Sequence, residues 1–183
     1  MPTIAAELSS KIITSKYGNK IKAQIWDTAG QEKYSSLATH YFKKANGVLL
    51  VCDLTNINTF KNLKKWVSII NDNTDDKCLI YLIGNKKDLD DKREVTEEMA
   101  KSFIKENRIN KYFEVSVFDN TVNQIENVFE FMLNTIDRMN FMSGGERVST
   151  LENNKSINRG LNGSQVINIQ KKVNSNEEEC SCC

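Results

Sequence analysis

The sequence predicts an α/β fold with a mainly parallel sheet, and two observations carry that prediction. Gly47–Cys52 and Cys78–Ile83 are continuous apolar runs rich in β-branched residues, which is typical of strands covered on both faces. Segments with apolar residues at helical spacing follow each of these runs. Strands that alternate with helices form βαβ units, and the strands of such units run parallel.

Composition and charge exclude several classes of protein. The 183 residues include 25 Lys+Arg, 24 Asp+Glu and one His, so the net charge of +1 gives no general attraction to nucleic acid. No apolar run approaches the roughly 20 residues of a membrane-spanning helix. No basic-then-apolar signal segment opens the sequence, which predicts a cytosolic setting. Five cysteines, three of them crowded at the C-terminus, do not form a disulfide framework.

The remaining elements are predicted from periodicity and from turn residues. Ile12–Thr14 and Ile21–Trp26 flank a turn-rich stretch and form a hairpin, and Tyr112–Val117 is a weaker strand. Three helices are expected, the second of them capped by Thr96. Their apolar positions are Phe60, Leu63, Val67 and Ile70 in the first, Met99, Ala100, Phe103 and Ile104 in the second, and Val122, Ile125, Val128, Phe129, Met132 and Ile136 in the third.

The composition changes near residue 142. Phe141 is the last aromatic residue, and Gly144 and Gly145 mark a boundary. The segment beyond is mostly Ser, Asn, Gly, Gln and charged residues, with too little apolar surface to offset the entropy of ordering. We therefore expect one folded domain over residues 1–142 and a disordered, flexible tail over residues 143–183.

A first motif, Ile25–Glu32, begins in the second hairpin strand and continues past its end. Asp27, at the carboxyl end of the strand, is placed to hold Mg²⁺ through water in the crevice where α/β sheets bind ligands. Gly30 lets a backbone N–H approach a phosphate oxygen, and Gln31 can orient an attacking water. The alternative interpretation of Asp27 taken alone is a solvated acid at the end of a strand.

A second motif, Gly84–Asp88, follows the end of a buried strand. The carboxylate of Asp88 can accept both N–H groups on one edge of guanine, whereas adenine lacks that pair of donors. Asn85 would brace the loop, and the stem of Lys86 would lie over the base. Asn-Lys-x-Asp alone is also a common polar turn, but here it follows the first motif by one βαβ unit, and together the two motifs are specific.

With both motifs in place, the sequence resembles the Rab branch of the Ras-like small GTPases over residues 2–139. This resemblance implies a doubly wound small G-protein fold, GTP/GDP-dependent switching and GTP hydrolysis, and a role in vesicle traffic. The Ser36–Ala38 segment is similar to endocytic Rabs, which implies endosomes. Further Rab-like segments are Lys22–Thr28, Tyr41–Ala45 and Leu50–Thr55.

The resemblance also implies roles for individual residues. Thr3 and Asp27 match the Mg²⁺-associated positions, Gly30 the γ-phosphate sensor and Gln31 the water-positioning residue. The guanine-reading positions match Asn85, Lys86, Asp88, Ser116 and Val117. Val117 and Phe118 replace the small residue and the Lys that this last loop usually carries, and the Val117 N–H would meet the guanine carbonyl.

One part of the family pattern does not occur in this sequence. Gly-x-x-x-x-Gly-Lys-Ser/Thr, the phosphate loop, is absent, and the first glycine is Gly18 in the hairpin turn. In the family's order, the first strand lies between the strands that end at Asp27 and Asp53. We therefore expect the first strand, the phosphate loop and the first helix to be missing, and a gap of unpaired backbone groups between those two strands.

Tight GTP binding and hydrolysis are not expected of this chain, because several backbone hydrogen bonds to phosphate are lost. That loss should lower the affinity by roughly three to four decades. We expect an incomplete gene model or a fragment, with a short isoform or a pseudo-GTPase as the alternative.

The tail ends in Cys180, Cys182 and Cys183. Three thiolates lack a fourth ligand for zinc, and the terminal Cys-Cys resembles the Rab signal for double geranylgeranylation at Cys182 and Cys183. Two lipids are needed, because residues 143–183 hold five basic and five acidic residues and give no electrostatic attraction to anionic lipid. The expected protein is a monomer on the cytoplasmic face of endomembranes that cycles with the cytosol.

Family resemblance also implies the partners. They are a guanine-nucleotide exchange factor, a GTPase-activating protein, a prenyl-binding escort and vesicle effectors, with no nucleic acid among them. The competing hypothesis is a non-catalytic, prenylated interaction module that presents a fixed surface.

Overall fold

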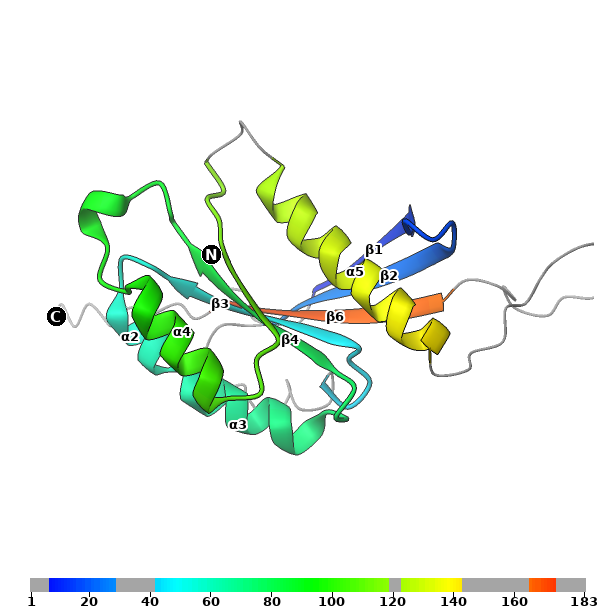
Figure 1. Ribbon diagram of the computed structural model, residues 1–183, viewed down its shortest axis with the longest axis horizontal. Helices are drawn as coiled ribbons and strands as arrows, with labels where there is room; N and C mark the ends of the chain where they lie inside the picture. The colour runs from blue at the N-terminus through cyan, green and yellow to red at the C-terminus, as the bar shows by residue number, and fades with distance from the viewer. Residues whose placement is uncertain (1–6, 29–41, 119–122, 143–164, 174–183) are drawn as a thin grey trace, which may run out of the picture.

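The computed structural model describes residues 7–28, 42–118, 123–142 and 165–173. Six strands form one sheet in the order β1-β2-β6-β3-β4-β5, with β1 antiparallel to β2 and each of the other neighbouring pairs parallel (Figure 1). The strands are β1 (Glu7–Thr14), β2 (Lys20–Thr28), β3 (Gly47–Asp53), β4 (Leu79–Asn85), β5 (Lys111–Glu114) and β6 (Gln165–Val173). The helices are α2 (Ile57–Lys61), α3 (Leu63–Asn73), α4 (Glu97–Glu106) and α5 (Gln124–Met142), with a 3₁₀ turn, η2 (Asp90–Lys92).

Helices cover both faces of the sheet, as the predicted doubly wound α/β fold requires. The helices α2, α3 and α4 lie on one face and α5 lies on the other (Figure 1). Every residue of β3 and β4 is buried except the last of each, which explains their continuous apolar sequence. The sheet therefore has two apolar faces, each with its own core.

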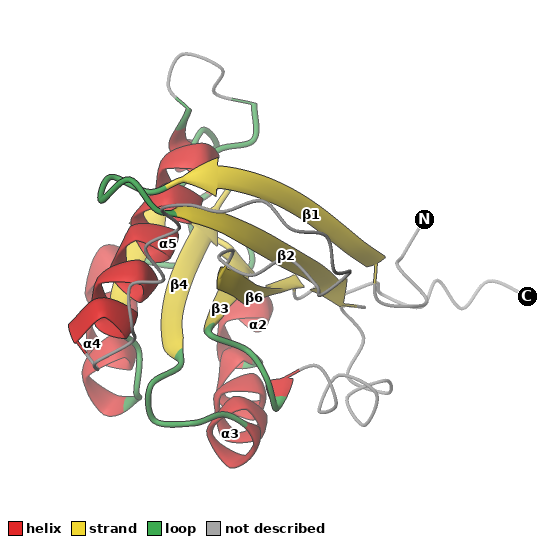
Figure 2. Cartoon of the chain, turned by 90° about the vertical axis from the view of Figure 1, so that its right-hand side faces the viewer, coloured by secondary structure: helices red, strands yellow, loops and turns green. Residues whose placement is uncertain are grey.

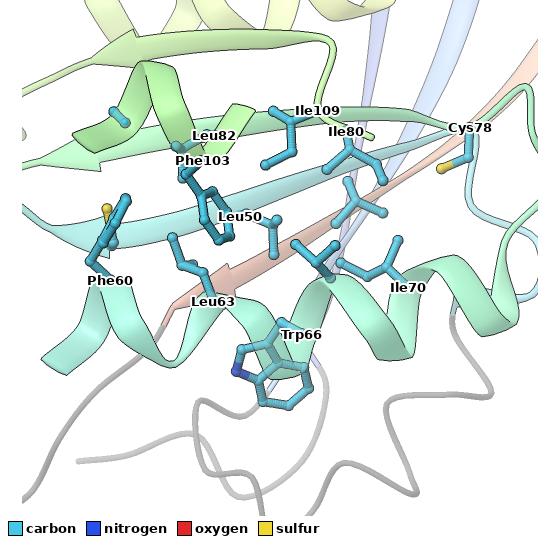
Figure 3. Packing of buried hydrophobic residues seen from close by; sticks show 14 of the residues in the cluster. Leu50, Phe60, Leu63, Trp66, Ile70, Cys78, Ile80, Leu82, Phe103 and Ile109 are labelled. Atoms are coloured by element: carbon cyan, nitrogen blue, oxygen red, sulfur yellow. The ribbon is translucent and has the colours of Figure 1, made fainter. Parts of the chain in front are cut away.

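The larger core lies between the sheet and α2, α3 and α4. Side chains of the first two helices meet apolar side chains of β3 and β4 there (Figure 3). Burial of each large side chain in this core contributes about 1.5–3 kcal/mol to stability. Members labelled in Figure 3 include Leu50, Phe60, Leu63, Trp66, Ile70, Ile80, Leu82, Phe103 and Ile109.

The β1–β2 hairpin is longer than predicted. Its turn is closed by backbone bonds from Ser15 N to Asn19 O (2.8 Å) and from Gly18 N to Ser15 O (2.9 Å). Gly18 has φ +83°, a conformation that glycine adopts without steric cost. Figure 2 shows the two strands as a long twisted ribbon along one side of the sheet. Period-2 alternation therefore located the pair correctly but not its full length.

The helix predictions are confirmed for the described residues. Thr96 caps α4, because its hydroxyl accepts the Met99 N–H at 3.3 Å. The first predicted helix is divided into α2 and α3 at Asn62. The third is α5, whose buried face includes Val128, Met132 and Ile136, while Val122 lies outside the described residues.

The tail contradicts one prediction. Residues 143–183 were expected to be disordered, yet Gln165–Val173 forms β6 between β2 and β3, parallel to both (Figure 1). The strand therefore lies where the resemblance places the family's first strand, and the expected gap between the strands ending at Asp27 and Asp53 is not present. A composition average over the tail hid a nine-residue segment with four β-branched residues.

Candidate functional site

Asp27 from the first predicted motif and the described residues of the second lie at the carboxyl edge of the sheet. Parallel pairing brings the ends of neighbouring strands to one edge, and Asp53 and Asn85 are register partners at the ends of β3 and β4. Asp27, near the end of β2, is separated from β3 by β6, so two strand spacings of about 4.8 Å each lie between them. The two predicted motifs therefore share this edge.

The Gly84–Asp88 loop is fixed by its own backbone and by close packing. A Cβ on Gly84 would lie 2.7 Å from Leu54 Cδ2, so only glycine fits there without a shift of Leu54. Lys86 adopts φ +66°, and Lys87 N donates to Val115 O at 3.2 Å. The loop after β4 is thus held against the loop after β5.

Ser116 supports Asp88 directly. Its hydroxyl donates to Asp88 Oδ1 at 2.5 Å, and Ser116 itself is buried. The Ser116 N–H bonds Gln124 Oε1 (3.3 Å), and the Phe118 N–H bonds Ser116 Oγ (3.1 Å). A carboxylate has further lone pairs, so Asp88, which is exposed, keeps the capacity to accept two N–H groups from a ligand.

Asn85 carries the clearest sign of a missing partner. Its Oδ1 is buried and has no hydrogen-bond partner among the described residues. Leaving a buried acceptor unpaired costs about 1–3 kcal/mol, so such atoms usually have a donor in the functional state. The atom lies at the edge where the base-reading motif begins. The residues present therefore fit a ligand that brings a hydrogen-bond donor to this edge.

An ion pair that the sequence did not predict holds the two strand ends together. Lys86 Nζ lies 2.6 Å from Asp53 Oδ2, and Thr55 donates its N–H (2.8 Å) and its hydroxyl (2.7 Å) to Asp53 Oδ1. Burial opposes ionisation of Asp53, but the bonds from Lys86 and Thr55 outweigh it and hold the pKa of this carboxyl below its usual range. The sequence feature that could have identified this ion pair is the position of Asp53 at the end of a strand next to the strand that ends at Asn85.

A second cluster that the sequence did not predict consists of Arg93, Tyr112 and Glu114. Arg93 makes a bidentate pair with Glu114, with Nη1–Oε1 and Nη2–Oε2 both at 3.0 Å, and the Tyr112 hydroxyl donates to Glu114 Oε1 at 2.6 Å. Burial raises the pKa of the Glu114 carboxyl, but Arg93 and Tyr112 outweigh it and lower the pKa. Burial and the neighbouring Glu114 carboxylate raise the pKa of Tyr112. The cluster fixes the end of β5 to the segment after η2.

Other predicted residues are placed only in part. Val117 is 58% and Phe118 82% exposed, so the bulky pair projects from the loop beside Ser116 into solvent. Thr3, Gly30, Gln31, Cys182 and Cys183 lie outside the described residues. Within the described ranges, no group of three or more His, Cys, Asp or Glu could hold a metal ion, and Asp27 lies opposite Glu7 in the register of β1 and β2. None of the described helices is long and apolar enough to cross a membrane.

Comparisons with known proteins agree with this geometry. Residues 1–138 match the model of the Ras family. Ras-related protein Rab-11B of Dictyostelium discoideum is 35% identical over 188 residues, covering 100% of this chain and 82% of the relative. GTP-binding protein ypt3 of Schizosaccharomyces pombe is 32% identical over 99% of this chain and 81% of its own length. Ras-related protein RABA2a of Arabidopsis thaliana is 32% identical over 99% of this chain and 79% of its own length.

Proposed function

This chain belongs to the Ras family as a Rab-like small GTPase, and from that premise we propose that its Gly84–Asp88 and Ser116 loops read the guanine base of GTP and GDP. A Rab-like small GTPase is a GTP-hydrolysing switch in intracellular vesicle traffic. The observation that carries the proposal is that a supported carboxylate, Asp88, and the buried Oδ1 of Asn85, which has no hydrogen-bond partner among the described residues, lie at the same edge of the sheet.

Base reading follows from hydrogen-bond chemistry. The carboxylate of Asp88 accepts from the two N–H groups on one edge of guanine, and Ser116 holds that carboxylate in place. Adenine presents an acceptor where guanine presents N1–H, so it would face Asp88 with a lone pair against a lone pair. The aliphatic stem of Lys86, whose Nζ pairs with Asp53, would lie over the base.

Roles toward the phosphates are proposed for residues of the first motif. Asp27 and Thr3 would hold Mg²⁺, which neutralises phosphate charge when it is bound. Gly30 would donate its backbone N–H to the γ-phosphate, and Gln31 would orient the attacking water. The exchange between GTP-bound and GDP-bound forms would change which partners bind.

Partners and location complete the proposal. Family membership implies exchange factors, GTPase-activating proteins and effectors in general, and we add a prenyl-binding escort. Geranylgeranyl groups on Cys182 and Cys183 would anchor the chain to the cytoplasmic face of endomembranes, endosomes among them, with return to the cytosol. A change of both cysteines to Ser should leave the protein cytosolic; unchanged membrane fractionation would contradict the anchor.

Nucleotide titration tests the base-reading loops. We expect fluorescent GDP to bind the purified chain with an affinity weaker than micromolar, because the sequence lacks the phosphate loop, and guanosine to compete where adenosine does not. Asp88→Asn should weaken guanine binding at least about tenfold, since one charged acceptor is lost. Asp91→Asn, an exposed acid four residues before Val95, is the matched control.

Two outcomes would contradict this account. If Asp88→Asn bound GDP like the parent, the base-reading role would be wrong. If the parent bound GDP more tightly than micromolar, the expected weakness would be wrong while the role of Asp88 would remain. Changes in the amide NMR shifts of Asp88 and Ser116 on addition of guanosine locate the site independently of affinity.

A further inference from the structure

A second concave site lies at the opposite edge of the sheet. An open cavity of about 420 Å³ is lined by the β1–β2 turn, the first residues of β4 and β5, and α5. Its size is within the range of small-molecule sites. Leu79 and Tyr81, both buried in the α5-side core, line it from the sheet. None of the residues assigned to guanine reading takes part.

Positive charge dominates the lining. Lys16 from the hairpin turn, Lys111 from β5 and Arg138 from α5 come from three separate elements, and none of them has an ion-pair partner among the described residues. No Asp or Glu is found in the described lining of the cavity. The site therefore concentrates three cations without a carboxylate to neutralise them.

Both lysines rest on aromatic rings. Lys16 Nζ lies 5.2 Å from the centroid of Tyr17, and Lys111 Nζ lies 5.2 Å from the centroid of Phe131. Exposed cation–π contacts are worth about 0.5–1 kcal/mol, which is less than a charge-assisted bond to an anion. Either ammonium group can therefore leave its ring when a stronger acceptor enters the cavity.

The polar lining also presents donors. Asn134 Oδ1 accepts the Lys16 N–H at 2.8 Å, and Asn110 Oδ1 accepts the Ile80 N–H at 2.7 Å. Each amide thereby has its oxygen engaged and its NH₂ group left to donate. The neighbouring acid, Asp137, is 1% exposed and accepts from the Ser15 hydroxyl and the Asn19 amide, so it is not part of the lining.

We propose that this cavity binds a multiply phosphorylated polyol, such as an inositol phosphate or the headgroup of a phosphoinositide lipid. Each phosphomonoester carries about −1.5 to −2 charges, so two of them carry about −3 to −4 charges, close in size to the total charge of the three cations. Phosphate oxygens accept from Lys, Arg and amide NH₂ groups, and polyol hydroxyls can exchange bonds with the same amides. The proposal does not depend on guanine binding.

Titration of the full, unlipidated chain with inositol trisphosphate, and with phosphatidylcholine vesicles that contain phosphatidylinositol bisphosphate, tests the site. We expect binding that weakens as salt is raised, and shifts of the Lys16, Tyr17 and Asn134 amide signals. Lys111→Glu with Arg138→Glu should reduce affinity at least about tenfold, because two attractive contacts become repulsive. Lys111→Arg with Arg138→Lys should keep most of it.

A matched control removes general electrostatic attraction from the result. Lys64→Glu with Lys65→Glu makes the same charge change on exposed residues of α3, away from the cavity, and should leave binding within about twofold. Binding to both probes, to vesicles alone, or to the free compound alone supports the site and identifies its source. Binding to neither, or an equal loss in the control, overturns the proposal.

Discussion

Two regions at the carboxyl edge of the sheet are held together in different ways. The base-reading region, around Gly84–Asp88 and Ser116, is fixed by short bonds between loops that follow neighbouring strands. The central region between β2 and β3 is filled by β6, a segment more than a hundred residues away from either strand along the chain. The first region therefore depends on adjacent strands, whereas the second depends on bringing together segments that are far apart along the chain.

The two regions therefore have different roles: the base-reading region is proposed to recognise guanine, and the central region completes the sheet. Asp88, Ser116 and Asn85 can be placed by β4 and β5, which pair directly with one another. Without β6, its neighbours β2 and β3 would be left with unpaired N–H and C=O groups. We infer that stability depends most on the central region and that guanine reading depends most on the loops.

Removal of β6 should have the largest effect. Deletion of residues 165–183 takes away eight register pairs with β2 and five with β3. At about 0.5–1.5 kcal/mol for each net hydrogen bond, the loss is at least about 5 kcal/mol, comparable to the whole stability of a small domain. Urea unfolding should show a strongly destabilised or aggregated protein.

The matched control is deletion of residues 174–183, which keeps β6 and should unfold like the parent. Ile167→Pro, in the middle of the strand opposite Ala23, should fall between the two deletions because it removes ladder bonds locally. If the two deletions were equally stable, β6 would not hold the sheet together.

The same contrast explains how far the sequence could predict the molecule. The sequence correctly identified Thr96 as a cap and placed Asn85 at the end of a buried strand and Asp88 just after it, because these features depend on neighbours along the chain. β6 could not be predicted, because its partners are distant and its tail averages to a disordered composition. Similarly, the Arg93–Glu114 pair requires knowledge of how the segment after η2 packs against the end of β5.

The second largest effect is expected from a methyl group on Gly84, which should strain the base-reading region. Its Cβ would lie 2.7 Å from Leu54 Cδ2 and 3.0 Å from Tyr112 Oη, and Leu54 is 1% exposed, so neither neighbour can move freely. Gly84→Ala should cost about 2–3 kcal/mol in urea unfolding. Gly18→Ala meets no atom within 4 Å and should cost about 1–2 kcal/mol through its positive φ. A larger loss at Gly18 would contradict the close packing at Gly84.

Glu114→Gln should have a smaller effect that depends on pH. It removes the charge that pairs with Arg93, and the expected loss is about 1–2 kcal/mol at neutral pH. Because the pKa of Glu114 is lowered in the folded protein, its contribution is present above the ordinary Glu pKa of about 4.3 and is lost as pH falls through the folded pKa. The difference between variant and parent should therefore shrink below about pH 4.3.

Glu106→Gln, an exposed change on α4, is the control for this pH series and should follow the parent throughout. A Glu114→Gln difference that stayed constant down to strongly acidic pH would show that the stabilisation comes from packing and not from the charge. Thermal unfolding monitored by circular dichroism is sufficient for both comparisons.

Substitutions of Lys86 should have the smallest effect on stability, and they separate the contribution of the ion pair with Asp53 from that of the backbone conformation. Its side chain is 46% exposed, so Lys86→Met should cost below about 1 kcal/mol through loss of the contact with Asp53. Lys86→Gly loses the same contact but relieves the positive φ of +66°, worth about 1–2 kcal/mol, against about 0.4–1 kcal/mol of added unfolded-state entropy. Urea unfolding should therefore rank Lys86→Gly at or above Lys86→Met, with the exposed Lys92→Met unchanged. The loss in Lys86→Met relative to Lys92→Met measures the ion pair, and Lys86→Gly ranking below Lys86→Met would show that relief of the positive φ does not offset the added unfolded-state entropy.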